Sequence, residues 1–174
     1  MIIKDNNFRV MQLFFKFPYK NFHIRELARI TGLSSTGIIK IVKRLKKEKL
    51  LLSKKEKVVK EIKPDFEGRF AFLKRVYNLY SLYDSGLIDY LKKEYESPQA
   101  IIVFGSYANG SDSERSDIDI AITMKKKQAI EVSTFEKKLS RKISIHNIDM
   151  KIIEPEFKNS LANGIVLEGF MDLS

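Results

Sequence analysis

Apolar and polar residues follow two different periods along this chain. In the first 98 residues the apolar positions recur mainly every three or four residues, a spacing typical of amphipathic helices. Residues 23–46 predict two short helices joined by a tight turn at Gly32, and residues 50–62 predict a β-hairpin with a lysine-rich turn. Residues 66–98 predict two further amphipathic helices, separated by a break at residues 84–86.

Strand patterns dominate the rest of the chain. Residues 101–104 form a continuous run of β-branched and aromatic side chains, which predicts a strand buried on both faces. Residues 118–122 and 143–153 alternate apolar and polar positions and predict two more strands. Together the elements predict an α+β protein of two domains.

Residues that could form a catalytic or binding site begin directly after the first of these strands. Gly105 permits a tight turn, and Ser106 stands where the unpaired N–H groups of a following helix would face an anion. Asp117 and Asp119 lie two apart in a strand pattern, so both carboxylates should share a face with Cα atoms roughly 6 to 7 Å apart. That spacing suits a hard cation such as Mg²⁺. Asp149 is expected on the polar face of the strand at 143–153.

This arrangement resembles the Gly-Ser…Asp-x-Asp signature of the DNA polymerase beta-like nucleotidyltransferase superfamily, in particular its minimal nucleotidyltransferases. The matching residues are Gly105, Ser106, Gly110, Asp117 and Asp119, and the resemblance runs from about residue 86 to the C-terminus. It implies a mixed sheet flanked by helices, with a closing strand at residues 164–170.

The same resemblance implies an activity and its cofactors. Members of that superfamily use two Mg²⁺ ions to transfer a nucleoside monophosphate from an NTP, here most simply ATP, and release pyrophosphate. By resemblance, Asp117, Asp119 and Asp149 would hold the metal ions, and Gly105 and Ser106 would bind the phosphates.

One residue departs from the family pattern. Many minimal nucleotidyltransferases carry an arginine at the position of Asn109, where it would add a cationic fork for phosphate. Arg115 or Lys151 could supply charge instead, or both could simply be exposed basic residues. With asparagine at this position, the site could either catalyse transfer or bind nucleotide without turnover.

Charge is divided very unevenly between the two parts of the chain. Residues 1–65 hold 17 Lys and Arg against 6 Asp and Glu, a net charge of +11, whereas residues 66–174 have a net charge of −1. A basic segment of this kind favours a polyanionic partner, and nucleic acid in particular.

The basic segment also carries a sequence motif. The helix expected at residues 35–46 is preceded by serines that can cap it, and its spacing resembles the helix-turn-helix of winged-helix transcription factors. In that arrangement the helix enters the major groove and the hairpin lysines contact phosphates. The alternative is a small domain that packs on a protein. The residues expected to contact DNA are Ser35, Thr36, Lys40, Lys43, Arg44, Lys54, Lys55 and Lys57.

Composition narrows the remaining possibilities. The chain has no cysteine, which excludes disulfides and thiol catalysis, and neither a signal-peptide pattern nor a membrane-length apolar run, so a cytoplasmic protein without a membrane partner is expected. The expected domains are a winged helix at 1–65, a connecting helix at 66–85 and a nucleotidyltransferase domain at 86–174. The only two histidines, His23 and His146, lack metal-ligand spacing, and His146 is expected to be a packed side chain.

Two functions remain from this pattern. The first is a Mg²⁺-dependent nucleotidyltransferase that modifies a hydroxyl of a protein or a small molecule, as antitoxin-type members do with a partner toxin, and that binds DNA through residues 1–65. The second is a DNA-binding regulator whose transferase domain senses nucleotide or holds a partner without chemistry. A homodimer is expected in either case, by analogy with winged-helix regulators.

Overall fold

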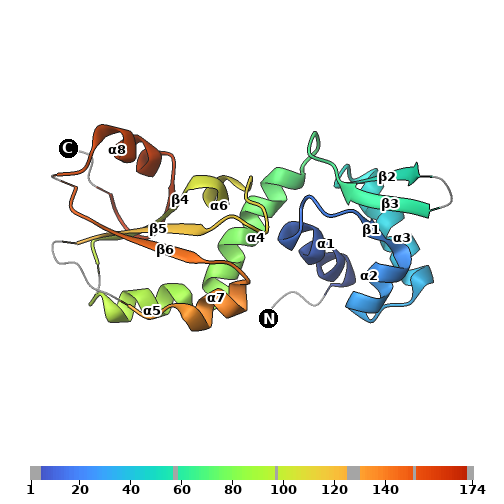
Figure 1. Ribbon diagram of the computed structural model, residues 1–174, viewed down its shortest axis with the longest axis horizontal. Helices are drawn as coiled ribbons and strands as arrows, with labels where there is room; N and C mark the ends of the chain where they lie inside the picture. The colour runs from blue at the N-terminus through green and yellow to red at the C-terminus, as the bar shows by residue number, and fades with distance from the viewer. Residues whose placement is uncertain (1–4, 57–58, 97, 125–129, 151, 172–174) are drawn as a thin grey trace. The chain divides into compact units, whose positions relative to one another are not determined.

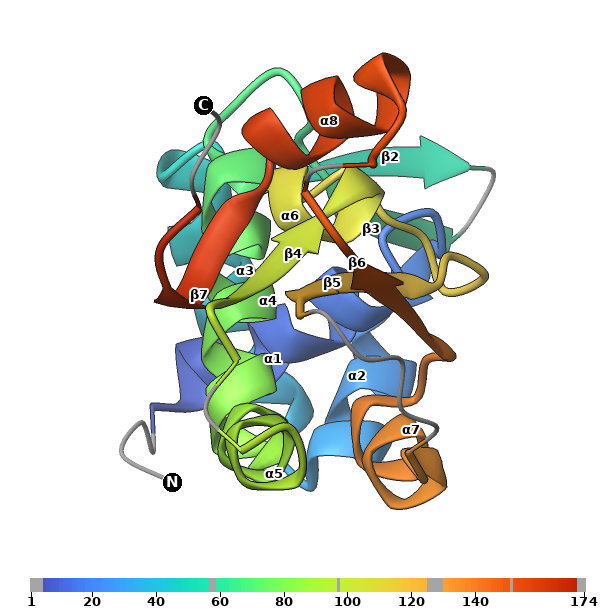
Figure 2. The same ribbon diagram turned by 90° about the vertical axis from the view of Figure 1, so that its left-hand side faces the viewer.

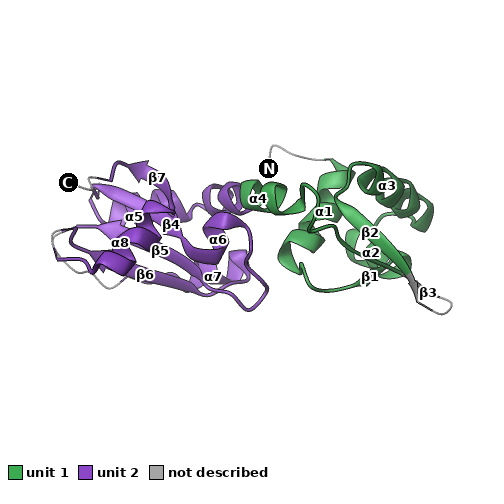
Figure 3. Ribbon diagram, turned by 90° about the horizontal axis from the view of Figure 1, so that it is seen from above, with its two compact units in different colours: residues 1–77 green, residues 78–174 purple. Residues whose placement is uncertain are grey.

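The computed structural model describes residues 5–56, 59–96, 98–124, 130–150 and 152–171 of the 174. The chain divides into two compact units, an N-terminal unit of residues 1–77 and a C-terminal unit of residues 78–174 (Figure 3). The segment expected to connect the domains is helix α4 (Phe70–Asp84), and the division falls inside it. Its first half therefore packs within one unit and its second half within the other.

The N-terminal unit combines helices with a small antiparallel sheet, in which the strands lie in the order β1-β3-β2. The pair of helices and the hairpin expected from the sequence are both present. The elements are α1 (Asn6–Lys16), β1 (Phe22–His23), α2 (Ile24–Thr31), α3 (Ser35–Lys47), β2 (Leu51–Glu56) and β3 (Val59–Pro64).

The turn between α2 and α3 forms as its residues predict. Gly32 ends α2 in the left-handed region with φ +67°, which a residue without Cβ adopts at little cost. Ser34 then caps α3, because its Oγ accepts a hydrogen bond from the backbone N–H of Gly37 at 3.1 Å. The apolar side of α3 faces the core of this unit through Ile38, Val42 and Leu45.

The first half of α4 completes this core. Phe70 and Tyr77 are buried there, and the ring of Tyr77 stacks on that of Phe15 in α1 with centroids 5.0 Å apart. Packing therefore explains the presence of Phe70 and Tyr77 in this helix.

The C-terminal unit is built on a mixed sheet with strand order β6-β5-β4-β7. Figure 1 shows β4, β5 and β6, and Figure 2 shows all four strands. β5 and β6 are parallel, while β4 pairs antiparallel with both β5 and β7. The elements are α5 (Leu87–Glu94), β4 (Ala100–Phe104), α6 (Gly105–Asn109), β5 (Ile118–Thr123), α7 (Ser133–Leu139), β6 (Ile143–Ile148), α8 (Pro155–Ala162) and β7 (Ile165–Gly169).

Helices cover both faces of this sheet (Figure 2). One face packs on the second half of α4 and on α5 and α7, with Leu82, Leu91 and Leu139 against the isoleucines of β4 and β5. The other face is covered by α8, where Leu161 lies in a smaller apolar cluster with Ile102 and Ile148. Because β4 contributes to both clusters, it is buried on both faces, as its continuous apolar run predicts.

Of the two last strands expected from the sequence, one is confirmed and the other is shorter than expected. The closing strand is confirmed as β7, but the strand expected over residues 143–153 ends at Ile148. The backbone N–H of Ile152 bonds to the carbonyl oxygen of Asp149 at 3.2 Å, so the chain turns directly after β6. None of the helices that the structure describes is long and apolar enough to cross a membrane.

Candidate functional site

The turn between β4 and α6 lies directly beside Asp119. Phe104, the last residue of β4, pairs with Asp119 in the antiparallel register of β4 and β5. Gly105 follows with φ +68°, and a Cβ added there would lie 3.0 Å from Oδ2 of Asp119. Glycine therefore allows the backbone to approach the carboxylate in a conformation that other residues rarely adopt.

Ser106 lies in the only turn of a very short helix. α6 has five residues, and it ends at Gly110, whose N–H bonds back to the carbonyl oxygen of Ser106. The corner therefore offers the N–H groups of a single turn, so a phosphate there would depend on close backbone approach and on the Ser106 hydroxyl more than on a long helix dipole.

The two aspartates of the Asp-x-Asp motif are on the side of β5 that faces away from the larger core. Ile118, between them, is fully buried against that core, whereas the side chain of Asp119 is 33% exposed and Asp117 is exposed just before the strand. The period of two expected from the sequence is therefore present at this strand.

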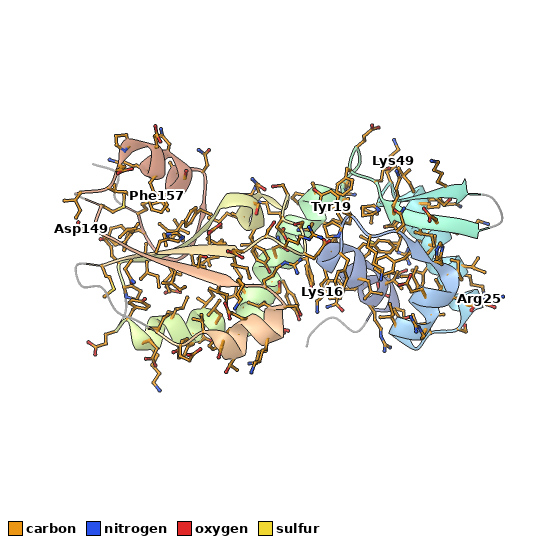
Figure 4. The ribbon with its side chains drawn as sticks, in the orientation of Figure 1. Lys16, Tyr19, Arg25, Lys49, Asp149 and Phe157 are labelled. Carbon is orange, nitrogen blue, oxygen red and sulfur yellow. The ribbon has the colours of Figure 1, made fainter. Side chains whose placement is uncertain are left out.

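Asp149 is not brought to this pair, which corrects the expected set of three carboxylates. In the parallel register Asp119 lies opposite Ser144, while Ile148 lies opposite Thr123 at the other end of β5. Asp149 is thus five positions beyond Ser144, roughly 16 Å along the strand direction. Figure 4 shows Asp149 at the end of β6 that lies away from α6.

His146 stands near Asp119 instead. Its Nε2 is 3.6 Å from Oδ1 of Asp119, and the strand register places both residues on the face covered by α8. The imidazole packs against Phe104 and against Phe157 of α8, with ring centroids 5.3 and 5.6 Å away. His146 is a packed side chain, as expected, but it also borders the carboxylate, which the sequence did not indicate.

Among the residues that the structure describes, no group of three His, Cys, Asp or Glu side chains is arranged to hold a metal ion. The donors near one another are the carboxylate of Asp119 and Nε2 of His146, with Asp117 two residues away along the strand. This donor set fits a cation that takes its remaining ligands from water or from a substrate phosphate.

A buried polar network holds the loop that leads to Asp117. The carboxylate of Asp112 is 1% exposed; its Oδ1 accepts a hydrogen bond from Asn78 Nδ2 at 2.7 Å, and its Oδ2 lies 3.8 Å from Nη2 of Arg141. Asn78 also donates to the carbonyl oxygen of Tyr107 at 2.9 Å. The network joins α4, α6 and the loop before β6, and no periodic pattern in the sequence pointed to it.

Burial changes the acidity of one residue in this region. Tyr107 in α6 packs in the larger core, and this burial raises the pKa of its phenol to about 12, although the hydroxyl of Ser81 lies 3.2 Å away and acts in the opposite direction. The phenol therefore stays neutral at physiological pH and supports the turn that follows Gly105.

Asn109, at the position where many minimal nucleotidyltransferases carry an arginine, is used within the turn. Its Oδ1 accepts hydrogen bonds from the backbone N–H of Ser111 at 3.0 Å and from the Ser111 hydroxyl at 2.6 Å. Arg115 is exposed in the same loop, and Lys151 lies outside the described residues. Asn109 thus stabilises local backbone.

The N-terminal unit presents a separate basic surface on α3. Five of the residues expected to contact DNA, Ser35, Thr36, Lys40, Lys43 and Arg44, are exposed on this helix. Arg44 also forms an exposed ion pair with Glu48 at 3.0 Å. Of the hairpin lysines, Lys54 is exposed in β2, Lys55 lies in the same strand, and Lys57 lies outside the described residues.

Comparison with known proteins gives one match, which lies within the C-terminal unit. No curated protein matches the chain. Residues 86–171 match the family model described as Polymerase beta, Nucleotidyltransferase, and this range contains the Gly105 corner, the Asp117 and Asp119 pair and all four strands of the mixed sheet. The match supports a nucleotidyltransferase domain of the polymerase beta type at residues 86–171.

Proposed function

We propose that this protein is a nucleotidyltransferase that moves a nucleoside monophosphate, most readily AMP, from an NTP to a hydroxyl acceptor. The observation that carries the proposal is the close approach of the Gly105 turn to the carboxylate of Asp119, so that a Cβ at Gly105 would lie 3.0 Å from Oδ2, inside a domain that matches the nucleotidyltransferase family. A glycine turn and a carboxylate at one point suit a triphosphate that binds together with cations.

Each residue has a role in this reaction. The backbone at Gly105 and the hydroxyl of Ser106 bind the triphosphate and orient its α-phosphorus. Asp117 and Asp119 would hold Mg²⁺ or a similar divalent cation, which, when bound, would neutralise phosphate charge and favour the ionised acceptor hydroxyl. The acceptor oxygen attacks the α-phosphorus in line, the bond to the β-phosphate oxygen breaks, and pyrophosphate leaves with that electron pair while the hydroxyl proton passes to solvent.

The acceptor is proposed by resemblance to the minimal nucleotidyltransferases. A hydroxyl of a partner protein, such as the toxin of an antitoxin-type pair, is the first class, and a small molecule is the second. The exposed position of Asp117 supports a bulky acceptor, because a protein side chain has to reach the site from solvent.

We also propose that the N-terminal unit is a winged helix that binds DNA, as a homodimer. Its support is the element order α1-β1-α2-α3-β2-β3 with the sheet order β1-β3-β2, the exposed basic face of α3 and the net charge of +11 on residues 1–65. In this proposal α3 lies in the major groove and the lysines of the hairpin contact phosphates.

A second candidate function is a DNA-binding regulator whose transferase domain binds nucleotide or a partner without turnover. Two observations favour it. Asn109 is turned onto Ser111, where the family often carries an arginine, and Asp149 lies at the far end of the sheet from Asp119. Both reduce the charge available for phosphoryl chemistry.

Nucleotide binding tests the main proposal without knowledge of the acceptor. We would titrate ATP, GTP, CTP and UTP into the full chain by calorimetry, with and without Mg²⁺, and compare Asp119→Asn with Asp149→Asn as the matched control. We expect Mg²⁺-dependent binding that Asp119→Asn removes and Asp149→Asn largely retains. Absence of binding for all four nucleotides would contradict the proposal, and binding without any Mg²⁺ dependence would favour the regulator.

A further inference from the structure

We propose that His146 is a ligand of a divalent cation that it shares with Asp119, so that this domain has a mixed nitrogen and oxygen metal site. The inference rests on the proposed function for the place of the cation. It goes further by assigning the imidazole a role and by naming the class of ion, Mn²⁺ or a neighbouring first-row metal, that the site prefers.

The two side chains are too far apart for a direct hydrogen bond and lie near the separation of two ligands on one tetrahedral ion. Nε2 of His146 and Oδ1 of Asp119 are 3.6 Å apart, which is too long for a hydrogen bond between them. Two ligands that each bind a cation at about 2.1 Å lie roughly 3.4 Å apart in tetrahedral geometry and about 3.0 Å apart in octahedral geometry. A small adjustment of either side chain is enough to bring both atoms into coordination.

The imidazole nitrogen is also buried without a hydrogen-bond partner. Nε2 of His146 is enclosed by protein atoms, although other atoms of the side chain reach solvent. A buried polar atom that lacks a partner is uncommon in native proteins and calls for an explanation such as an ion. Coordination to a cation held by Asp119 provides the missing partner.

The surrounding aromatic rings hold the imidazole in place. Phe104 contacts it from the end of β4 with an edge-to-face arrangement, and Phe157 contacts it from α8. Phe157 also packs on Phe104 at 5.3 Å, so the three rings form one cluster on this face of the sheet. A ligand that is already ordered loses little conformational entropy when it binds a metal.

The donor types indicate which metal binds. Mg²⁺ favours oxygen ligands in octahedral geometry, whereas divalent first-row transition metals also bind mixed nitrogen and oxygen sites, with an affinity that rises from Mn²⁺ to Cu²⁺. Asp117 can add a further oxygen, and the remaining positions stay open for water or for phosphate oxygens. We therefore expect Mn²⁺ to bind more tightly than Mg²⁺ at this site, because the site offers a nitrogen donor.

Pulsed electron paramagnetic resonance of bound Mn²⁺ tests the inference directly. Imidazole ¹⁴N coordinated to Mn²⁺ produces a characteristic echo modulation. We would load the full chain with Mn²⁺ and inorganic tripolyphosphate, a probe that contains no nitrogen. We expect the modulation in the wild-type protein and in His23→Gln, and its loss in His146→Gln. Because the chain has only two histidines, these variants account for every imidazole.

A Mn²⁺ binding titration on the same proteins gives the second readout. Loss of a partner behind a metal ligand already costs roughly 10- to 100-fold in affinity, so His146→Gln should weaken Mn²⁺ binding by at least about tenfold. His146→Phe serves as a second variant, since it keeps an aromatic ring between Phe104 and Phe157 and removes the donor atom.

The outcomes separate this inference from the proposed function. Mn²⁺ and tripolyphosphate that bind together without ¹⁴N modulation, with affinities unchanged in both His146 variants, would overturn the metal ligand and leave the transferase proposal standing. A protein that binds neither Mn²⁺ nor tripolyphosphate would overturn both.

Discussion

The two units of this protein differ in how their candidate functional surfaces are built. In the N-terminal unit the basic surface lies on one helix, α3, and every residue of that surface is within about three turns of the Ser34 cap. In the C-terminal unit the candidate site combines the end of β4, the start of β5, the middle of β6 and a residue of α8. The first surface follows from local periodicity, and the second depends on strand register.

This difference has a physical origin. A helix places its side chains every 100° whatever surrounds it, so the exposed face of α3 is determined once the helix forms. A strand can slide against its neighbour, and each shift by one residue exchanges the side chains that face a given partner. The N-terminal surface should therefore tolerate changes in packing that would displace the C-terminal site.

The largest expected effect is on the stability of the C-terminal unit, because this unit contains the buried ion pair of Asp112 and Arg141. Arg141→Met leaves the Asp112 carboxylate buried beside a neutral side chain, which should cost about 3–5 kcal/mol of unfolding free energy in the C-terminal unit. Chemical denaturation followed by circular dichroism would measure it. Arg115→Met in the exposed loop is the matched control and should change stability by less than about 0.5 kcal/mol.

The same experiment can fail in an informative way. If Arg141→Met shifts the unfolding of both units together, their stabilities are coupled through the shared helix α4. If it shifts the unfolding of neither unit, the Asp112 network does not stabilise the loop. The C-terminal site would then not depend on this buried network more than the α3 surface depends on its own helix.

A second prediction concerns DNA binding by the N-terminal unit. Lys43→Ala combined with Arg44→Ala removes two cations from the exposed face of α3, so DNA affinity should fall by roughly tenfold and the slope of its salt dependence should decrease by about 2. Fluorescence anisotropy at several salt concentrations would show both. Triphosphate binding by the C-terminal unit should not change.

The control for that prediction uses the other unit. Lys93→Ala combined with Lys137→Ala removes two exposed lysines from α5 and α7 with the same change in net charge. An equal loss of DNA affinity in both double variants would mean that overall charge, rather than the α3 surface, attracts DNA, and the winged-helix proposal would then fail.

A third prediction concerns the pH dependence of the C-terminal unit. The phenol of Tyr107 has its pKa raised by burial to about 12 in the folded protein, against 10.0 for the ordinary group. The folded state therefore retains a proton that the unfolded state releases, and the free energy of unfolding should decrease by about 1.4 kcal/mol per pH unit as pH rises from about 10 toward 12. Denaturation midpoints at pH 9 to 11.5 would measure the slope.

Tyr107→Phe isolates this contribution because it removes the titrating group and keeps the ring. We expect a shallower decline at alkaline pH in this variant, whereas Tyr19→Phe, at an exposed tyrosine of the N-terminal unit, should leave the decline unchanged. Equal slopes for wild type and Tyr107→Phe would show that the phenol is not buried in solution.

Much of the fold could be predicted from the sequence because the signals are local. The α2 and α3 pair with its Gly32 turn, the hairpin at β2 and β3, the buried strand β4 and the break at Gly86 all appear where their residues indicate. The Gly105 turn and the alternation around Ile118 were predicted in the same way. Each depends on the conformational preferences of a few adjacent residues.

Other features could not be predicted, since they depend on contacts between distant residues. The alternation over residues 143–153 indicated a strand but not where it stops or which residue of β5 it faces, and only the resemblance to the nucleotidyltransferases placed Asp149 beside Asp119. The hydrogen bond from Asn78 to Asp112 joins residues 34 apart, and the proximity of His146 to Asp119 depends on the pairing of β5 with β6.

The sequence by itself determined the α+β composition, the uneven distribution of charge and the turn that brings a glycine to the end of β4. These follow from backbone preferences, hydrophobic periodicity and counts of charged groups, none of which needs the rest of the molecule. Only the tertiary structure decided which side chain lies next to Asp119, because strand register is set by the burial of whole faces of the sheet between α5, α7 and α8.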